Sequence, residues 1–576
     1  MNEIESSMNT DKTNSWDRME APVIKPVDAP IRDRSGLLPL LFSAQEKEGY
    51  LSVEAVRVAA ELTGLTDNQV YGFATVYPWF RFSKGPVPDV DGASFPGGRV
   101  PASRSFPSIP ETPPEASGEA NAFSPDGRGE VRAALRNIGT VNPESIDEYI
   151  RLGGYCGLSK ALSGTPGEVT DIVKRSGLGE EGFPGLSLDY QWILRDRSPG
   201  ATPWIIGLAA GADPVFLAEG FLLENDPYGV LEGMLIAGYA SGASQGILYV
   251  NADMKAALSR LETALDQMKR SGRIGNDVRG ASLSFQLQLV PAPGPIPCAE
   301  ALRVIPALEG RRPENCFMPK GAREPVFRGN PAVILSVETL AKLPAVMANG
   351  ADWYAGLGLD GHRGTRLVTL AGCVARPGVA EIPAGMPLRE IIDQIGGGVP
   401  DGTALKAVRI GGPSGGWLAA DDLDLPYAPE AMAAAGGGLD SGSLVAAGKD
   451  VCALVLARQG LLFAGRQSCG HCTICREGTR QMAEILHDII RGRSRARDLE
   501  LLEDLSEGLR LGSSCSLGRT APAPFLTILR RFRAEFEAHI RENRCLSGFC
   551  LIPDHESAGG PAGDATDPGR ERRDLK

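Results

Sequence analysis

The sequence lacks the features that would point to several large classes of function. It has no excess of positive charge, since 59 Lys and Arg stand against 71 Asp and Glu. Nucleic acid is therefore not expected as a partner, because phosphate binding needs a basic face. Met1–Pro22 is polar and has no apolar core typical of a secretory signal. The best candidate for a bilayer span, Val451–Gly465, is short and contains Arg458. These absences predict a soluble, cytoplasmic protein without direct membrane insertion.

Cysteine is scarce, and its distribution is uneven. The chain has 11 cysteines, and none precedes Cys156. In a reducing compartment, clustered cysteines indicate metal binding rather than disulfides. Three of them, in "SCGHCTICREGT", follow one another at a strict three-residue spacing: Cys469, Cys472 and Cys475. A hydrophobic core does not need cysteine at such regular intervals, so the spacing predicts three thiolates at one metal centre.

A fourth ligand is available in "LGSSCSLG". Cys515 lies there, with 39 residues between it and Cys475, and the helix pair expected between them can bring it back to the loop. The pattern C-x2-C-x2-C-x39-C predicts a [4Fe–4S] cluster. A mononuclear zinc site is the main alternative, although zinc sites usually pair two Cys-x-x-Cys motifs. Purely structural cysteines are a third interpretation.

A second set of metal-ligating residues surrounds the same helical region. It consists of one histidine and three cysteines: Cys452, His539, Cys545 and Cys550. Structural zinc often uses such a set. The alternative is a lone buried Cys452, an exposed His539 and a free cysteine pair. The remaining cysteines, Cys156 among them, are expected to be buried apolar residues.

Periodicity and composition predict an α/β protein of several domains. Between 201 and 290, apolar strand-like runs alternate with long helical patterns, which favours a Rossmann-like parallel sheet. A compact β-rich module and a helical bundle that carries the cluster loop follow. The predicted order is a disordered start at 1–35, a small helical domain at 36–83, a linker rich in Pro, Gly and Ser at 84–129, the α/β domain at 130–350, an α+β module of ubiquitin-like size at 351–430, the bundle at 431–552 and a disordered tail at 553–576.

The cluster segment resembles that of a known family. "SCGHCTICREGT" followed by the distant "SSCSLG" is similar to the NADH- and FMN-binding subunit of respiratory complex I, and to the matching subunits of NAD-dependent hydrogenases and formate dehydrogenases. "DPYGVLEGMLIAGYA" and "VETLAKLPAVMANGADWY" stand in family order, and the similarity extends from about Asn142 to Cys550. The resemblance implies a flavin- and NADH-type domain at 130–350, a ubiquitin-like (SLBB-type) module after it, and other redox subunits as partners.

The amino end resembles a different subunit of the same complexes. "EGYLSVEAVRVAAELTGLTDNQVYGFATVYPWF" is similar to the helical start of the partner that carries a [2Fe–2S] cluster. In that family a thioredoxin-like domain with four cysteines follows, whereas 84–129 holds no cysteine. We therefore expect no second cluster in this chain and interpret the helical piece as a docking element.

The glycine-rich turn that the family uses for FMN is altered here. The turn typically reads GRGGAGFP, because phosphate needs backbone N–H groups and close approach. Here "SGLGEEGFPG" is shorter and adds Glu180 and Glu181, whose carboxylates repel a phosphate. The family's pattern survives only at Gly179, Gly182, Phe183 and Pro184.

Three further pocket motifs also lose their polar residues. The family's NADEGEPG reads "GLAAGADPV", in which Leu208, Ala210 and Gly211 replace an amide and two acids and only Asp213 keeps an acid. CGEETA reads "CAEALR", in which Glu300 remains. A pair of Asn before VETL has become Leu335–Ser336. Together the changes predict a degenerate FMN and NAD(H) pocket.

These observations predict an iron–sulfur electron-transfer subunit of an NADH-dehydrogenase-like complex. Its cluster would pass single electrons between redox centres of partner subunits, through which any membrane association would arise. The first alternative is an active FMN-dependent NADH:acceptor (quinone) oxidoreductase, in which FMN takes a hydride and releases single electrons. The second is a non-redox scaffold that cluster and zinc merely stabilise. The altered pocket argues against catalysis by this chain alone.

Overall fold

The fold is taken from a computed structural model. It describes residues 41, 44, 51–63, 132–180, 202–278, 283–292, 296, 303–311, 325–359, 361–400, 404–413, 415–439, 441–550 and 552. The predicted disordered ends and the linker at 84–129 lie outside these residues. The chain divides into two compact units, Met1–Ser94 and Phe95–Lys576, and each is described by itself.

The first unit contains a helix where the sequence predicts one. Helix α2 spans Val53–Thr63. The hydroxyl of Ser52 accepts a hydrogen bond from the N–H of Ala55 at 3.1 Å, as an N-cap does. Val56, Ala59 and Ala60 are buried along one side of the helix.

The second unit begins with a five-stranded sheet in the order β3-β2-β1-β5-β4. The parallel strands are β1 (Trp204–Ala209), β2 (Gln245–Asn251), β3 (Gln286–Ala292) and β5 (Asn330–Ser336), and the antiparallel edge strand is β4 (Val326–Phe327). Residues of β1, β2 and β5 are buried on both faces, which is typical of parallel sheets covered by helices. The predicted parallel sheet is confirmed.

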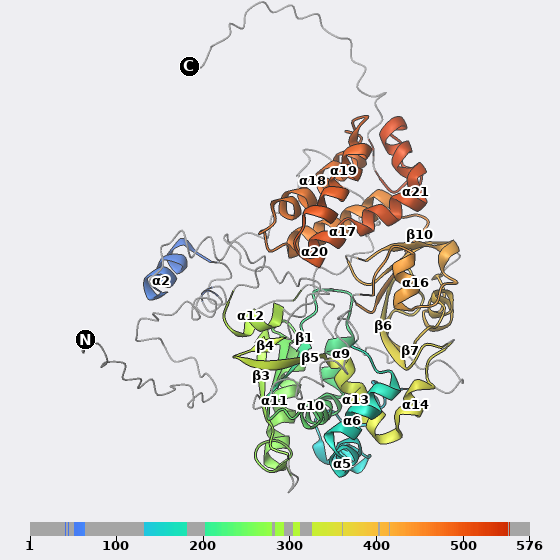
Figure 1. The fold of residues 1–576 in the computed structure, drawn as a ribbon. Coiled ribbons are helices and arrows are strands. Elements are labelled where there is room, and N and C mark those ends of the chain that lie inside the picture. Colours follow the sequence, from blue (N-terminus) through green and yellow to red (C-terminus); the bar gives the residue numbers. More distant parts are fainter. Residues whose placement is uncertain are drawn as a thin grey trace, which may run out of the picture. The chain divides into compact units, whose positions relative to one another are not determined.

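The helices of this domain pack against the sheet or against one another (Figure 1). They are α4 (Ile146–Arg151), α5 (Cys156–Ser163), α6 (Pro166–Ser176), α9 (Ala218–Asn225), α10 (Pro227–Ser241), α11 (Lys255–Arg270), α12 (Val304–Leu308), α13 (Val337–Asn349) and α14 (Ala351–Ala355). Helix α10 packs directly on α13, and the contact depends on Gly233. A Cβ there would lie 2.0 Å from the carbonyl oxygen of Leu340, so any larger residue would push the helices apart.

The next sheet forms the ubiquitin-like module, in the order β7-β6-β10-β8-β9. Its strands are β6 (Thr365–Gly372), β7 (Gly378–Pro383), β8 (Leu405–Ile410), β9 (Trp417–Ala419) and β10 (Ser443–Gly448), with α15 (Leu388–Glu390) running into a π-helical turn at Ile391–Ile395, and with α16 (Pro429–Ala434). The central strand β10 lies beyond residue 430, where the sequence predicts the module to end. The glycines before it conceal the strand, because they interrupt the apolar pattern.

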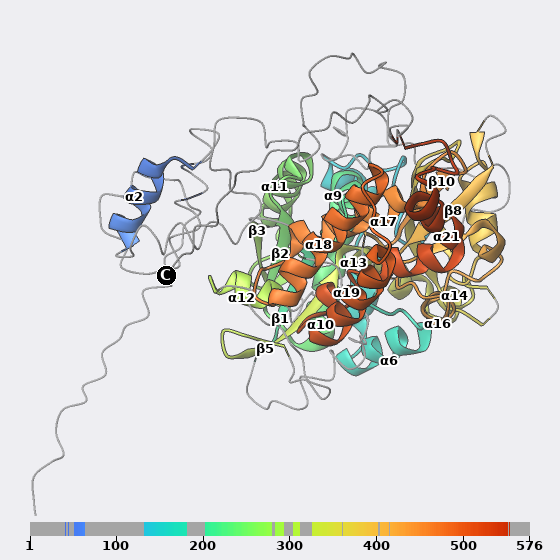
Figure 2. The ribbon, with the colours of Figure 1, turned by 90° about the horizontal axis from the view of Figure 1, so that it is seen from above.

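The chain then forms a helical bundle, seen from above in Figure 2. Its helices are α17 (Ala453–Gln467), α18 (Thr473–Ile490), α19 (Asp498–Gly512), α20 (Ser516–Thr520) and α21 (Ala523–Glu542). Helix α17 packs on α18 and α21, and α18 packs on α19. Among the helices of the described residues, none is long and apolar enough to cross a membrane.

Candidate metal centres

The four predicted cluster cysteines stand at the ends of bundle helices. Cys469 lies in the loop between α17 and α18, Cys472 is the N-cap of α18, and Cys475 lies in its first turn. Cys515 is the N-cap of α20. Gly470 turns the loop with φ +76°, a conformation that glycine adopts without strain. Thiolates at helix N-termini are favoured by the partial positive charge there.

The hairpin of α18 and α19 brings Cys515 back to the triplet. The backbone N–H of Ser514, its neighbour, donates to Cys472 Sγ at 3.4 Å, and the Ser514 hydroxyl lies 3.3 Å from the same sulfur. Burial raises the pKa of the Cys475 thiol, and the charges of the other three thiols raise it further. The hydrogen bond to Ser468 lowers this pKa. The two contacts of Ser514 place the start of α20, and with it Cys515, beside Cys472.

The neighbours of the four thiols are small or polar. A Cβ at Gly518 would lie 3.2 Å from Cys475 Sγ and 2.5 Å from Ser513 Oγ, so the cradle requires glycine there. The hydroxyl of Ser468 lies 3.4 Å from Cys475 Sγ. The guanidinium of Arg303 donates to Cys515 Sγ at 3.4 Å. Four thiols with hydrogen-bond donors around them fit the ligand set of a [4Fe–4S] cluster.

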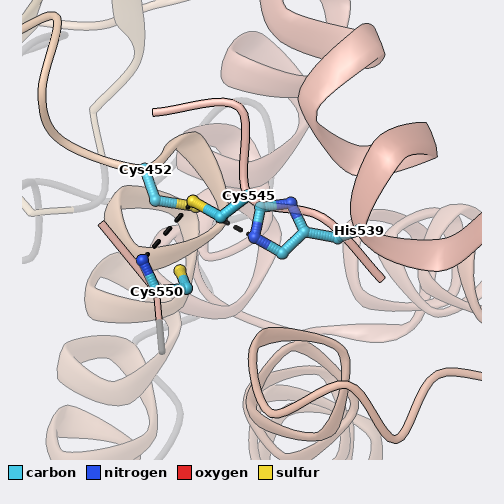
Figure 3. A group of neighbouring side chains, drawn as sticks. All are labelled: Cys452, His539, Cys545 and Cys550. Atoms are coloured by element: carbon cyan, nitrogen blue, oxygen red, sulfur yellow. Dashed lines mark hydrogen bonds between the residues drawn. The ribbon is translucent and has the colours of Figure 1, made fainter. Parts of the chain in front are cut away.

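The second predicted set is also brought together, where the two ends of the bundle meet (Figure 3). Ligand atoms of Cys452, His539, Cys545 and Cys550 all lie within 4.8 Å of one another. Ligands held about 2.3 Å from a tetrahedral zinc are roughly 3.8 Å apart, so small movements would complete the site. His539 is fully buried, which removes the alternative that it is exposed.

The tautomer of His539 is set by its backbone contact. Its Nδ1 lies 2.7 Å from the carbonyl oxygen of Glu535, an acceptor, so Nδ1 carries the proton. The other ring nitrogen, Nε2, faces Cys452 Sγ at 3.6 Å. A hydrogen-bonded carbonyl behind a histidine is the usual support of a zinc ligand.

The flavin-type pocket is only partly described. Gly182, Phe183, Pro184 and Glu300 lie outside the described residues, and so does Glu181. Gly179 follows α6, and its carbonyl oxygen accepts a hydrogen bond from the hydroxyl of Thr339 at 3.3 Å. The next residue, Glu180, reaches the N-terminus of α13. Its Oε1 accepts from the backbone N–H of Ser336, the N-cap, at 2.9 Å.

The acidic residue retained from the altered pocket strand contacts the ubiquitin-like module. The hydroxyl of Ser443 donates to Asp213 Oδ2 at 2.5 Å, and the hydroxyl of Ser441 donates to the same oxygen. Leu208 and Ala210, which replace polar residues of the family, are buried in an apolar cluster.

Glu219 is a further acid of this region. Its Oε2 accepts from the N–H of Gly211 at 3.1 Å. Burial raises the pKa of Glu219 to about 7; the N–H of Gly211 lowers this pKa, whereas the charges of Glu338 and Asp213 raise it. The region therefore holds several carboxylates close together.

The sequence interpretation missed some of these contacts and misjudged one cysteine. Arg303 carries no signal beyond being the last letter of "CAEALR", where the family motif has Ala. The serine partners of Asp213 carry no sequence signal, because they belong to another domain. Cys156, expected to be buried, is exposed at the start of α5, so that expectation is wrong.

Comparison with known proteins decides the family. Residues 455–539 match the NADH-ubiquinone oxidoreductase-F iron-sulfur binding region, 173–345 the Nuo51 FMN-binding domain, 367–417 the SLBB domain and 24–89 the thioredoxin-like [2Fe-2S] ferredoxin family. The chain is 39% identical over 421 residues to the NADP-reducing hydrogenase subunit HndC of Solidesulfovibrio fructosivorans, covering 73% of this chain and 86% of that relative. The chain belongs to the family of NADH-quinone oxidoreductase F subunits.

Other relatives agree with this assignment. The F subunit of NADH-quinone oxidoreductase from Escherichia coli is 32% identical over 403 residues, covering 69% of this chain and 91% of that relative. The fold is shared with a crystal structure of an NAD+-reducing [NiFe]-hydrogenase in the H2-reduced state, with TM-score 0.67 and 23% identity over 88% of this chain and 94% of that one. Both resemblances stated from the sequence, that of the main chain and that of its amino end, are confirmed.

Proposed function

We propose that this chain is the iron–sulfur electron-transfer subunit of an NADH-dehydrogenase-like complex. The observation that carries the proposal is the meeting of thiols from two distant segments, Cys469–Cys475 and Cys515, at the helix ends of the bundle. A [4Fe–4S] cluster bound there would supply one-electron storage. The chain's own part is to shield the sulfurs, to donate hydrogen bonds to them and, through Gly518, to leave the space for the cluster.

The proposal includes a degenerate flavin pocket, and Glu180 is its clearest support. A helix N-terminus binds anions because its N–H groups are free and its dipole is positive there. Here a carboxylate of the chain already accepts the N–H of Ser336. An FMN phosphate at this end of α13 would have to displace Glu180 or lie beside its negative charge. The side chain of Glu180 therefore does not suit a flavin phosphate, whereas the four thiols of the bundle suit a cluster.

Partner subunits are implied by the relay role. A cluster in a soluble bundle transfers electrons only to a centre nearby, and the relatives are by name subunits of hydrogenases and quinone oxidoreductases. We infer redox partner subunits, no nucleic acid, and a cytoplasmic location with membrane contact only through those partners. The helix of the first unit is the proposed docking element.

Stepwise reduction of anaerobically purified protein tests this function. Dithionite is expected to produce the electron paramagnetic resonance (EPR) signal of a reduced [4Fe–4S] cluster, whereas NADH, with or without added FMN, is expected to produce none. Cluster reduction by NADH would instead establish the FMN-dependent oxidoreductase. A cluster that dithionite cannot reduce would leave the non-redox scaffold.

A structural zinc ion at Cys452, His539, Cys545 and Cys550 is the second part of the proposal. The site joins the start of α17 to the end of α21 and to the residues after it. Elemental analysis of protein made without added zinc should give about one zinc per chain, and a strong chelator should remove it only on unfolding. Protein that is fully folded and zinc-free would contradict the site.

A further inference from the structure

Arg303 connects the flavin-type domain to the cluster loop. It is the N-cap of α12, and only 4% of its surface is exposed. Its Nη2 donates to the sulfur of Cys515, the ligand that comes from the far end of the α18–α19 hairpin, at 3.4 Å. A segment 212 residues away in sequence thus places a guanidinium on a cluster ligand.

The side chain of Arg303 is a cation whose planar N–H donors hold a fixed direction. Because the site is buried, water screens the charge less than at the surface. The family motif CGEETA has Ala at the position of Arg303. This chain therefore has a cation where the family has a methyl group, in a segment that also differs at its pocket residues.

The other contacts around the cluster loop differ from this one. Ser468 and Ser514 approach sulfur with neutral groups. Arg519 donates to the carbonyl oxygen of Ser513 at 2.9 Å, and Arg476 donates to the carbonyl oxygen of Gly470. Those two arginines hold the backbone of the loops, whereas Arg303 contacts a thiolate ligand directly.

We propose that Arg303 is a positioning residue that raises the reduction potential of the cluster through Cys515. The proposal rests on the proposed function, since it requires the cluster. A one-electron reduction adds one negative charge to the cluster and its thiolates and needs no proton. A buried cation that donates a hydrogen bond to one of those thiolates stabilises the reduced form more than the oxidised form. The consequence is a cluster that accepts electrons readily and retains them.

A redox titration of the full-length protein tests this role. Dithionite is the reductant, mediator dyes are present, and EPR measures the reduced cluster. Arg303→Gln removes the charge and keeps an N–H donor. Arg303→Lys keeps the charge and lacks the planar set of donors of the guanidinium. At a potential equal to the parent midpoint, the ratio of reduced to oxidised cluster should fall about tenfold in Arg303→Gln, which corresponds to about 59 mV for one electron. Arg303→Lys should fall between this variant and the parent.

A matched control is available on the same segment. Arg311 is exposed and paired with Glu309, so Arg311→Gln removes the same charge from a position open to solvent and should leave the midpoint unchanged. A shifted midpoint potential in Arg311→Gln would show that the net charge of the protein, and not the contact with Cys515, sets the potential.

Each outcome decides the proposal. Equal midpoints in the parent and both Arg303 variants, with iron retained, would overturn it and leave the proposed function standing. Loss of iron from both variants would assign Arg303 to cluster assembly and would also overturn it. If only Arg303→Gln loses iron, the midpoint of Arg303→Lys decides: a value below the parent supports the role and a value equal to it does not. A parent without iron or EPR signal would instead refute the proposed function itself.

Discussion

The cluster end and the flavin-type end of this chain use the same structural device and differ in what stands there. In both, polar groups lie at a helix N-terminus. At α18 and α20 those groups are Cys472 and Cys515, which suit a cluster. At α13 the N–H of Ser336 donates a hydrogen bond to the carboxylate of Glu180. If the flavin pocket is degenerate, as we propose, then a few side chains at helix starts decide what each end of the same fold binds.

The largest expected effect concerns the cluster end. Cys475→Ser removes a buried thiol that we propose as a cluster ligand, so iron should fall below about a tenth of the parent content. Iron and sulfide assays of purified protein measure this. Cys156→Ser is the control, since Cys156 is exposed on α5 and should leave iron unchanged. Full iron in Cys475→Ser would show that the sulfurs do not act together.

The zinc set adds a second, smaller test at the same end. Cys452→Ser should release zinc and lower the free energy of unfolding by about 3 kcal/mol, because the metal couples the two ends of the bundle. Chemical denaturation with parallel zinc analysis measures both. Cys373→Ser, a half-buried cysteine of the ubiquitin-like module, should change neither. An unchanged stability in Cys452→Ser would mean that the four residues hold no metal.

At the flavin-type end, Glu180→Gln should weaken the fold and improve the pocket. Losing a charge-assisted bond to a helix N-terminus should cost about 1 kcal/mol of stability. Removing the negative charge should strengthen FMN binding by about tenfold, equivalent to about 1.4 kcal/mol. Fluorescence quenching of FMN measures the affinity, and Glu484→Gln, in an exposed ion pair on α18, is the control. An unchanged affinity for FMN would show that Glu180 is not what weakens FMN binding.

The last prediction is a pH dependence of the stability that comes from Glu219. Its pKa in the folded protein, about 7, lies above the ordinary value of 4.5, so the folded state binds more protons between these values. The unfolding free energy should therefore fall as pH rises from about 4.5 to about 7, by no more than about 2 kcal/mol because the residue keeps some solvent contact. Urea denaturation at pH 5 and pH 8 measures the difference. Glu219→Gln should reduce this fall, whereas Glu262→Gln, at an exposed position of α11, should retain it. The same slope in both variants would refute the assignment.

Much of the framework could be predicted from the sequence, because its signals are local. Strands β1 and β2 and helices α10 and α11 follow the apolar patterns, whereas the assignment of the four cluster cysteines, made from their spacing, stays a prediction. Strand β10 could not be found this way, since glycines precede it and its partners are distant in sequence.

The roles of single polar residues were harder to predict. The sequence predicts that Glu180 repels a phosphate, but it could not show that this carboxylate bonds Ser336. Arg303 acts across 212 residues, and the bonds of Asp213 to Ser441 and Ser443 cross between two domains. Such contacts depend on how domains pack, which no local pattern encodes.

We propose that the ligand set of the cluster is complete whereas the flavin pocket is degenerate. Joint determination of iron, zinc and FMN in anaerobically purified protein tests this difference. We expect about four iron atoms and about one zinc per chain, with FMN far below one per chain. FMN at one per chain, released on acid denaturation, would contradict it, and so would zinc in place of iron.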